Sequence, residues 1–120
     1  MSVSIYKEFT FEAAHKLPNV PDGHKCGRLH GHSYRIRIHL SGDIDPTLGW
    51  FIDFSDVKKI FSPILEQLDH HYLNAIEGLE NPTAEVIAIW VWDKLNSELP
   101  TLTGIELMET CTCGVLYQGK

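Results

Sequence analysis

Residues 30–41, HGHSYRIRIHLS, alternate between two kinds of side chain and predict a long β-strand. Successive side chains on a strand point to opposite faces of the sheet. One face therefore begins with two histidines and continues as an apolar stripe, through His30, His32, Tyr34, Ile36, Ile38 and Leu40. The opposite face carries Ser33, Arg35, Arg37 and His39. The pattern is typical of a half-buried strand whose inner face ends in a pair of imidazoles.

The segment before this strand shows the same period of two. Residues 5–15 place on one face Ile5, Lys7, Phe9, Phe11, Ala13 and His15. Residues 17–29 contain two prolines and two glycines and predict a loop. If the two strands pair across that loop, His15 comes close to the two histidines of the second strand.

Two helices are expected in the second half of the chain. Asp53 is a suitable N-cap for the first, whose apolar stripe contains Pro63, a residue that should kink or split it. Asn81 is expected to cap the second helix, with Pro82 in its first turn and its end at about Leu99.

The remaining strands complete the predicted sheet. We expect a short strand at residues 50–52 and two strands within residues 105–117, broken near Gly114. Because the helices are grouped together in the sequence, this order predicts an α+β fold. An antiparallel sheet would carry both helices on one face.

The bulk composition indicates one soluble domain spanning residues 1–120, with 43% hydrophobic and 22% charged residues. No apolar run has the length of a membrane span, and no leader peptide is recognisable at the N-terminus, so a cytoplasmic location is expected. The net charge of −6 argues against nucleic-acid binding. Residues 15–37 are locally basic, which suits either a small polyanion or a solvated surface. Three cysteines are too few for a disulfide framework.

The histidines are the most informative polar residues. His30 and His32 point the same way on a strand, so both can reach one metal ion, and His15 can supply a third nitrogen. Three nitrogen ligands with one open position are typical of catalytic zinc. The alternative is that these are unrelated polar groups at strand ends.

Two further groups have the chemistry of acids and bases. Cys26 lies in a basic, glycine-containing loop four residues before His30, and a thiol in such surroundings is a competent base or nucleophile. Asp69 precedes His70, and a carboxylate can orient a neighbouring imidazole. These groups matter for catalysis only if the fold brings them together.

Glu109 shares a predicted strand face with apolar residues, where an unpaired carboxylate is costly. Its partner could be a structural arginine. It could equally be a ligand with two adjacent N–H donors, such as the edge of a pterin ring.

Several motifs together resemble the pterin synthase family that includes 6-pyruvoyltetrahydropterin synthase. They are FEAAH (11–15), CGRLHGH (26–32), IDF (52–54), LDHHYLN (68–74), NPTAE (81–85) and ETCT (109–112). The match runs in order over nearly the whole chain. Three residues separate the cysteine from HGH, which resembles the bacterial queuosine-pathway branch that forms 6-carboxytetrahydropterin rather than the pyruvoyl-forming branch.

The resemblance implies a tunnelling fold, in which sheets of several subunits join into a barrel, commonly a trimer or a dimer of trimers with sites between subunits. It also implies a zinc-dependent carbon–carbon lyase. The substrate would be 7,8-dihydroneopterin triphosphate, and the products 6-carboxytetrahydropterin, acetaldehyde and triphosphate.

Roles for individual residues follow from the same resemblance. The zinc ligands would be His15, His30 and His32, and Cys26 would be the catalytic base. Asp69 and His70 would assist proton transfer, and Glu109 would anchor the pterin ring. Separately from the resemblance, Lys25 and Arg28 of the basic stretch could help to bind the triphosphate despite the negative net charge.

Three rival interpretations are compatible with the same residues. The first is a 6-pyruvoyltetrahydropterin synthase, and the second is a zinc-binding module without catalysis. The third is a metal-dependent hydrolase, which needs a carboxylate beside the metal to activate water.

Overall fold

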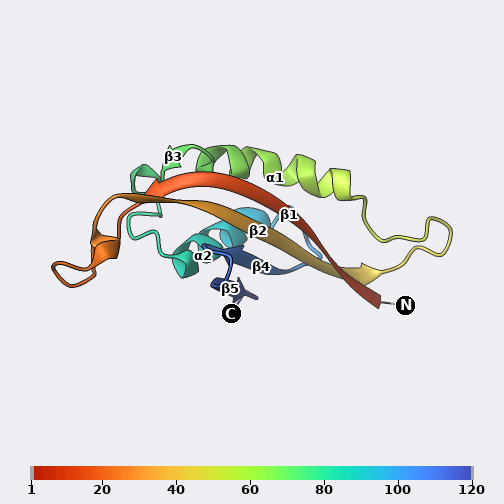
Figure 1. Ribbon diagram of the computed structural model, residues 1–120. Helices are drawn as coiled ribbons and strands as arrows, with labels where there is room; N and C mark the ends of the chain where they lie inside the picture. Colours follow the sequence, from red (N-terminus) through yellow and green to blue (C-terminus); the bar gives the residue numbers. More distant parts are fainter. Residues whose placement is uncertain (1, 120) are drawn as a thin grey trace.

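The computed structural model describes residues 2–119 as an elongated molecule with principal extents of 58 × 24 × 23 Å. Two long strands arch along its length, with the helices beside them (Figure 1). The strands are β1 (Ser2–His15), β2 (His30–Asp43), β3 (His71–Tyr72), β4 (Leu102–Met108) and β5 (Gly114–Tyr117). The α-helices are α1 (Phe54–Leu68) and α2 (Ala84–Leu95), and two short 3-10 turns, η1 and η2, cover Lys25–Gly27 and Leu73–Ala75.

The five strands form one sheet in the order β3-β1-β2-β4-β5. Neighbouring strands are antiparallel except for β3, which pairs in parallel with β1 at Ala13 and Ala14 only. Within the described residues, the rest of that edge of β1, from Ser2 to Glu12, has no partner strand. The predicted antiparallel sheet with two helices on one face is confirmed, with this short parallel strand as an addition.

One face of the sheet forms the core with the helices. The alternation predicted for the first two strands is observed, because Phe11, Ile36 and Ile38 are buried while Thr10 and Glu12 are exposed. Helix α1 contributes four buried residues to this core, Val57, Phe61, Ile64 and Leu68. None of the helices within residues 2–119 has the length and apolar character needed to cross a bilayer.

The first helix begins as predicted, because the Asp53 side chain accepts a hydrogen bond from the Ser55 N–H. Pro63 does not split it, since α1 runs unbroken to Leu68. Pro63 lies on the exposed side, where water can solvate the carbonyl that the proline leaves without an N–H partner. The buried residues on the opposite side hold both halves against the sheet.

The second helix begins and ends elsewhere than predicted. Thr83, not Asn81, is the N-cap, and its hydroxyl accepts from the Val86 N–H. Helix α2 ends at Leu95, four residues before the predicted end. The Asn81 capping prediction was wrong because Pro82 lies before the helix instead of in its first turn.

Two predicted strand features also differ. Residues 50–52 form bends instead of a strand, although Phe51 and Ile52 still pack against the core. Strand β4 ends at Met108, so Glu109 follows the strand instead of lying on its inner face. The side chain of Glu109 is 29% exposed, and the expectation of a buried carboxylate was therefore wrong.

Candidate metal centre and active site

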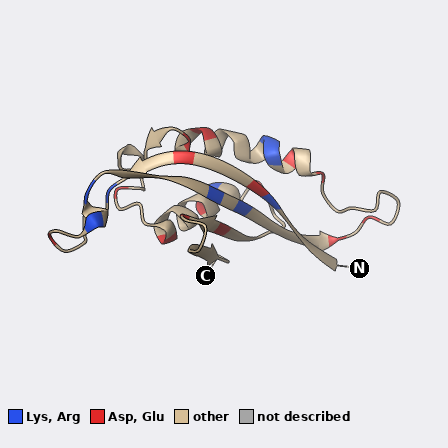
Figure 2. Cartoon of the chain, in the orientation of Figure 1, with Lys and Arg blue, Asp and Glu red and all other residues tan. Residues whose placement is uncertain are grey.

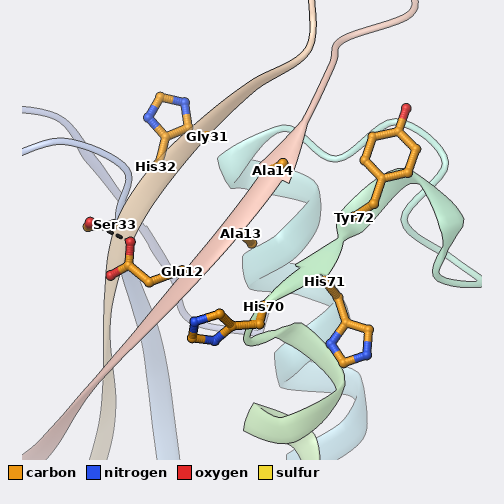
Figure 3. A pocket seen from close by; sticks show the side chains of 9 residues that line it. All are labelled: Glu12, Ala13, Ala14, Gly31, His32, Ser33, His70, His71 and Tyr72. Carbon is orange, nitrogen blue, oxygen red and sulfur yellow. Dashed lines mark hydrogen bonds between the residues drawn. The ribbon is translucent and has the colours of Figure 1, made fainter.

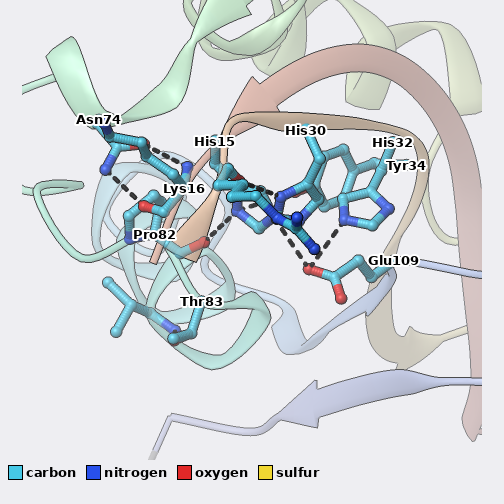
Figure 4. Close-up of polar contacts among 11 residues, drawn as sticks. His15, Lys16, His30, His32, Tyr34, Asn74, Pro82, Thr83 and Glu109 are labelled. Atoms are coloured by element: carbon cyan, nitrogen blue, oxygen red, sulfur yellow. Dashed lines mark hydrogen bonds and ion pairs between the residues drawn. The ribbon is translucent and has the colours of Figure 1, made fainter. Parts of the chain in front are cut away.

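Three histidines meet at one end of the sheet, where β1 ends and β2 begins (Figure 4). His15 pairs with His30 in the β1–β2 register, and His32 lies two residues further on the same face. One ring nitrogen from each histidine lies within 4.8 Å of those of the other two. The strand pairing predicted from alternation therefore brings together a group of side chains that could hold a metal ion.

Hydrogen bonds at the Nδ1 atoms orient two of the rings. His15 Nδ1 donates to the Pro82 carbonyl at 2.8 Å, and His30 Nδ1 donates to the Arg28 carbonyl at 2.7 Å. In the neutral rings, both Nε2 atoms then carry lone pairs, and these two atoms are only 3.0 Å apart. Facing lone pairs at this distance need a proton or a cation between them.

His32 supports the same interpretation. Its Nε2 is buried and has no hydrogen-bond partner among the described residues. A buried polar atom without a partner is costly, and a metal ion would supply the missing interaction. The donor set of three imidazole nitrogens suits zinc and leaves one position open for another ligand.

Burial keeps His15 in the form that binds metals. The ring is 1% exposed, and this burial lowers the pKa of His15 below its ordinary value of 6.5. The bond to Pro82 and the charge of Glu109 oppose that shift, and the neighbouring histidines reinforce it. The imidazole is therefore mostly neutral near pH 7 and available as a ligand.

Glu109 reaches the histidine cluster from the end of β4. Its Oε2 lies 3.7 Å from His15 Nε2 and 3.8 Å from His32 Nε2 (Figure 4). No arginine is its ion-pair partner within residues 2–119, so the structural-arginine alternative is not supported. The carboxylate faces the place where a metal ion and its ligand would lie.

The cluster opens into a cavity of about 540 Å³, called here the histidine cavity. Besides the three histidines and Glu109, its walls include Lys25, Cys26 and Arg28. Turn η1 positions Cys26, and the His24 side chain caps this turn by accepting from the Cys26 N–H at 3.0 Å. The basic residues of this loop lie at the end of the molecule opposite the N-terminus (Figure 2). Seven of the predicted site residues therefore share one cavity.

His70 lines a different hollow, called here the strand-edge cavity, whose walls also include Glu12, Ser33 and His32 (Figure 3). Asp69 directly precedes His70 and contacts its ring. His70 Nδ1 lies 3.0 Å from Asp69 Oδ1, and the His70 side chain is 77% exposed. The Glu12 N–H donates to Asp69, and together with His70 it lowers the pKa of the Asp69 carboxyl. The pair is formed as predicted, but it does not face Cys26 within one chain.

The backbone at His70 is unusual. Its φ of 60° lies in the left-handed region, where a residue other than glycine is uncommon. The backbone N–H of His70 donates to the Glu12 carbonyl, which holds this conformation. Such outliers are often found at functional sites.

Several residues around the cluster have contacts that no sequence pattern predicts. Pro82 and Asn74 were part of quoted motifs, but no pattern indicated that their polar atoms approach β1. Tyr34 is fully buried beside the histidines, with its hydroxyl 3.4 Å from His15 Nδ1, and burial raises the pKa of that hydroxyl. Cys111 and Cys113 are exposed and line a separate hollow outside the histidine cavity.

Comparisons with known proteins give matches over nearly the whole chain. A family profile described as 6-pyruvoyl tetrahydropterin synthase matches residues 4–120. A 6-carboxy-5,6,7,8-tetrahydropterin synthase of Synechocystis is 47% identical over 119 residues, covering 94% of this chain and 91% of the relative. A dihydroneopterin monophosphate aldolase of Pyrococcus furiosus is 32% identical, covering 83% of this chain and 81% of the relative. The structure of 6-pyruvoyl tetrahydropterin synthase from Caenorhabditis elegans superposes with a TM-score of 0.92 at 29% identity, covering 100% and 97% of the two chains.

Proposed function

The chain belongs to the 6-pyruvoyl tetrahydropterin synthase family, and from this premise we propose that it is a zinc-dependent carbon–carbon lyase. The reaction would convert 7,8-dihydroneopterin triphosphate and one water molecule to 6-carboxy-5,6,7,8-tetrahydropterin, acetaldehyde and triphosphate, as a step of queuosine biosynthesis. The observation that carries the proposal is the histidine cavity, in which three histidines, Cys26 and Glu109 surround one space. The Synechocystis relative, whose name gives 6-carboxy-5,6,7,8-tetrahydropterin as its product, is 47% identical to this chain.

The proposed metal is zinc, held by the Nε2 atoms of His15, His30 and His32. The carbonyls of Pro82 and Arg28 fix the first two rings from behind, which leaves their Nε2 lone pairs free. When bound, zinc would act as a Lewis acid on the side-chain hydroxyls of the substrate and make the adjacent protons more acidic. Proton transfer and substrate binding are assigned to residues of the chain.

Cys26 is the proposed base on the side of the histidine cavity. Turn η1 presents its partly buried thiol to the same space as the three imidazoles, where it can accept a proton from the substrate side chain. Lys25 and Arg28 also line this cavity, so they are placed to attract the triphosphate despite the net charge of −6.

The Asp69–His70 pair is proposed to complete the site of a neighbouring subunit. Asp69 orients the imidazole through Nδ1, which leaves Nε2 of an exposed ring free to give or take a proton. Because the pair does not line the histidine cavity of its own chain, we propose that it acts on a substrate bound by a second copy. A trimer or a dimer of trimers, expected for the family, would provide that arrangement.

Glu109 is proposed to bind the pterin ring through two adjacent N–H groups. The free carboxylate lies within 4 Å of two of the proposed zinc ligands. This position also favours a second candidate function, metal-assisted hydrolysis, in which a carboxylate activates metal-bound water. The products distinguish the two functions, because hydrolysis would release phosphate and leave the carbon skeleton intact.

The decisive experiment incubates the zinc-loaded protein with 7,8-dihydroneopterin triphosphate and measures acetaldehyde, triphosphate and the pterin product. Equal amounts of acetaldehyde and 6-carboxytetrahydropterin are expected. Formation of 6-pyruvoyltetrahydropterin without acetaldehyde would instead assign the pyruvoyl-forming reaction. A parallel assay with dihydroneopterin monophosphate tests for an activity like that of the Pyrococcus furiosus relative. The absence of any turnover would favour a zinc-binding module.

A further inference from the structure

Asn74 makes a group of hydrogen bonds beside the metal centre that the proposed chemistry does not use. This residue belongs to turn η2, far from the histidines in sequence. Its Oδ1 accepts from the Lys16 N–H at 3.1 Å, and its Nδ2 donates to the Lys16 carbonyl at 2.7 Å (Figure 4). The same Nδ2 lies 3.4 Å from the Glu80 carbonyl.

These contacts join the two backbone segments that bear the His15–Pro82 bond. Lys16 directly follows His15, and Glu80 lies two residues before Pro82. The Asn74 amide therefore connects the end of β1 to the segment that supplies the carbonyl for His15 Nδ1. Within the described residues, no other side chain makes hydrogen bonds with both segments.

The segment containing Asn74 is itself well anchored. Leu73 and Leu79 are fully buried in the core on either side of it. Pro82 is also buried, so its carbonyl has no ready access to water as an alternative partner. A small displacement of the segment would consequently move this carbonyl away from Nδ1 instead of exchanging one partner for another.

We propose that Asn74 is a positioning residue for the metal ligand His15. By fixing Lys16 and the 80–82 segment together, it keeps the Pro82 carbonyl against Nδ1 and the His15 ring in the tautomer with a free Nε2 lone pair. A group that accepts a hydrogen bond from a metal-binding histidine, as the Pro82 carbonyl does, orients the ring and increases its basicity. The inference rests on the metal centre under Proposed function and adds a residue that sets its affinity.

The test compares zinc affinity of wild type, Asn74→Ala and Asn74→Asp, using competition with a chromophoric chelator. The Asp variant keeps the acceptor for the Lys16 N–H but loses both donated bonds. Removing a direct hydrogen-bond partner of a metal ligand costs about 10- to 100-fold in affinity, and Asn74 acts through such a partner, so we expect a loss of about 10-fold for Asn74→Ala. Asn96→Ala is the matched control, because Asn96 is exposed and the structure records no side-chain hydrogen bond for it within residues 2–119.

Two further measurements separate positioning from general stability. The absorption spectrum of the Co²⁺-loaded protein reports ligand geometry, and urea unfolding without metal reports stability. A changed Co²⁺ spectrum together with weaker zinc binding would support the proposal. Wild-type affinity and an unchanged spectrum would overturn it, even with lower stability. If Asn74→Ala does not fold, Asn74→Asp decides by the same criteria.

The control measurements also separate this inference from the function on which it rests. Wild type that binds zinc, with Asn74 variants that bind it equally well, would overturn the role of Asn74 alone. Wild type that takes up neither Zn²⁺ nor Co²⁺ would overturn the metal centre and the positioning role together.

Discussion

Cys26 and His70 line different cavities of the same chain. Both residues are proposed to transfer protons during one reaction, so a single chain does not bring together all the proton-transfer groups of one active site. If the missing half comes from a second copy, each variant that lacks one of the two residues should be rescued by the other.

Mixing Cys26→Ala with His70→Ala should therefore restore activity that neither variant has alone. After subunit exchange at equal concentrations, about a quarter of the sites would combine an intact Cys26 with an intact His70, so roughly that fraction of wild-type turnover is expected. The measurement is acetaldehyde release before and after exchange in mild denaturant. Mixed assemblies that stay inactive, formed from two variants that are each inactive alone, would contradict a site shared between two chains.

Replacing Cys26 alone should separate catalysis from metal binding. Cys26→Ala is expected to lose turnover while retaining zinc, because its thiol is proposed to accept a proton and not to bind the metal. Zinc content by elemental analysis and product formation are measured on the same preparation. Cys113→Ala, which alters an exposed thiol outside the histidine cavity, is the control. Full activity of Cys26→Ala would remove this residue from the mechanism.

The buried, unpartnered Nε2 of His32 leads to a prediction about metal affinity. His32→Ala should weaken zinc binding by more than the roughly 100-fold that loss of an outer partner costs. His39→Ala is the matched control, because His39 lies on the opposite face of β2 and bonds to Glu106 at 2.8 Å. Equal zinc affinity in the two variants would contradict the proposed ligand set.

Glu109→Gln should impair substrate recognition more than metal binding. The amide keeps one acceptor but turns the other into a donor, which opposes the N–H groups of the pterin edge. Loss of a hydrogen bond to a charged group predicts a fall in kcat/KM of about 10- to 100-fold. Glu98→Gln, at an exposed position, is the control. A large loss of zinc from Glu109→Gln would instead identify the carboxylate as a ligand.

The lowered pKa of His15 predicts how the metal-free protein responds to acid. The unfolded chain takes up a proton at His15 near pH 6.5, whereas the buried ring takes it up only at a lower pH. The stability due to the neutral ring is therefore complete above pH 6.5 and is lost as the pH falls through the folded-state pKa. An NMR titration of the His15 ring in metal-free protein should give a midpoint below 6.5. A midpoint at or above 6.5 would contradict the role assigned to burial.

The grouping of the histidines was predictable because it depends on local alternation. His15 ends an apolar stripe, and His30 and His32 begin one, so antiparallel pairing places all three on the inner face. The fold class followed from the same alternation and from the grouping of the helices. The roles of these residues as ligands stay predictions.

Other features were not predictable because they depend on contacts distant in sequence. Strand β3 has only two residues, both exposed, and exists because its backbone meets β1. The partners of Glu109 were missed because β4 ends one residue before it. No sequence pattern identifies the Pro82 carbonyl as the partner of His15, since the two are 67 residues apart.

The unpaired edge of β1 affects how a newly synthesised chain assembles. From Ser2 to Phe11, this edge presents backbone groups that can pair with another extended strand. In the expected barrel, a second subunit would cover this strand edge. A chain that has not yet joined an oligomer can therefore associate wrongly through it. Slow assembly would lengthen that interval and give misassociation at this edge more time to compete with formation of the oligomer.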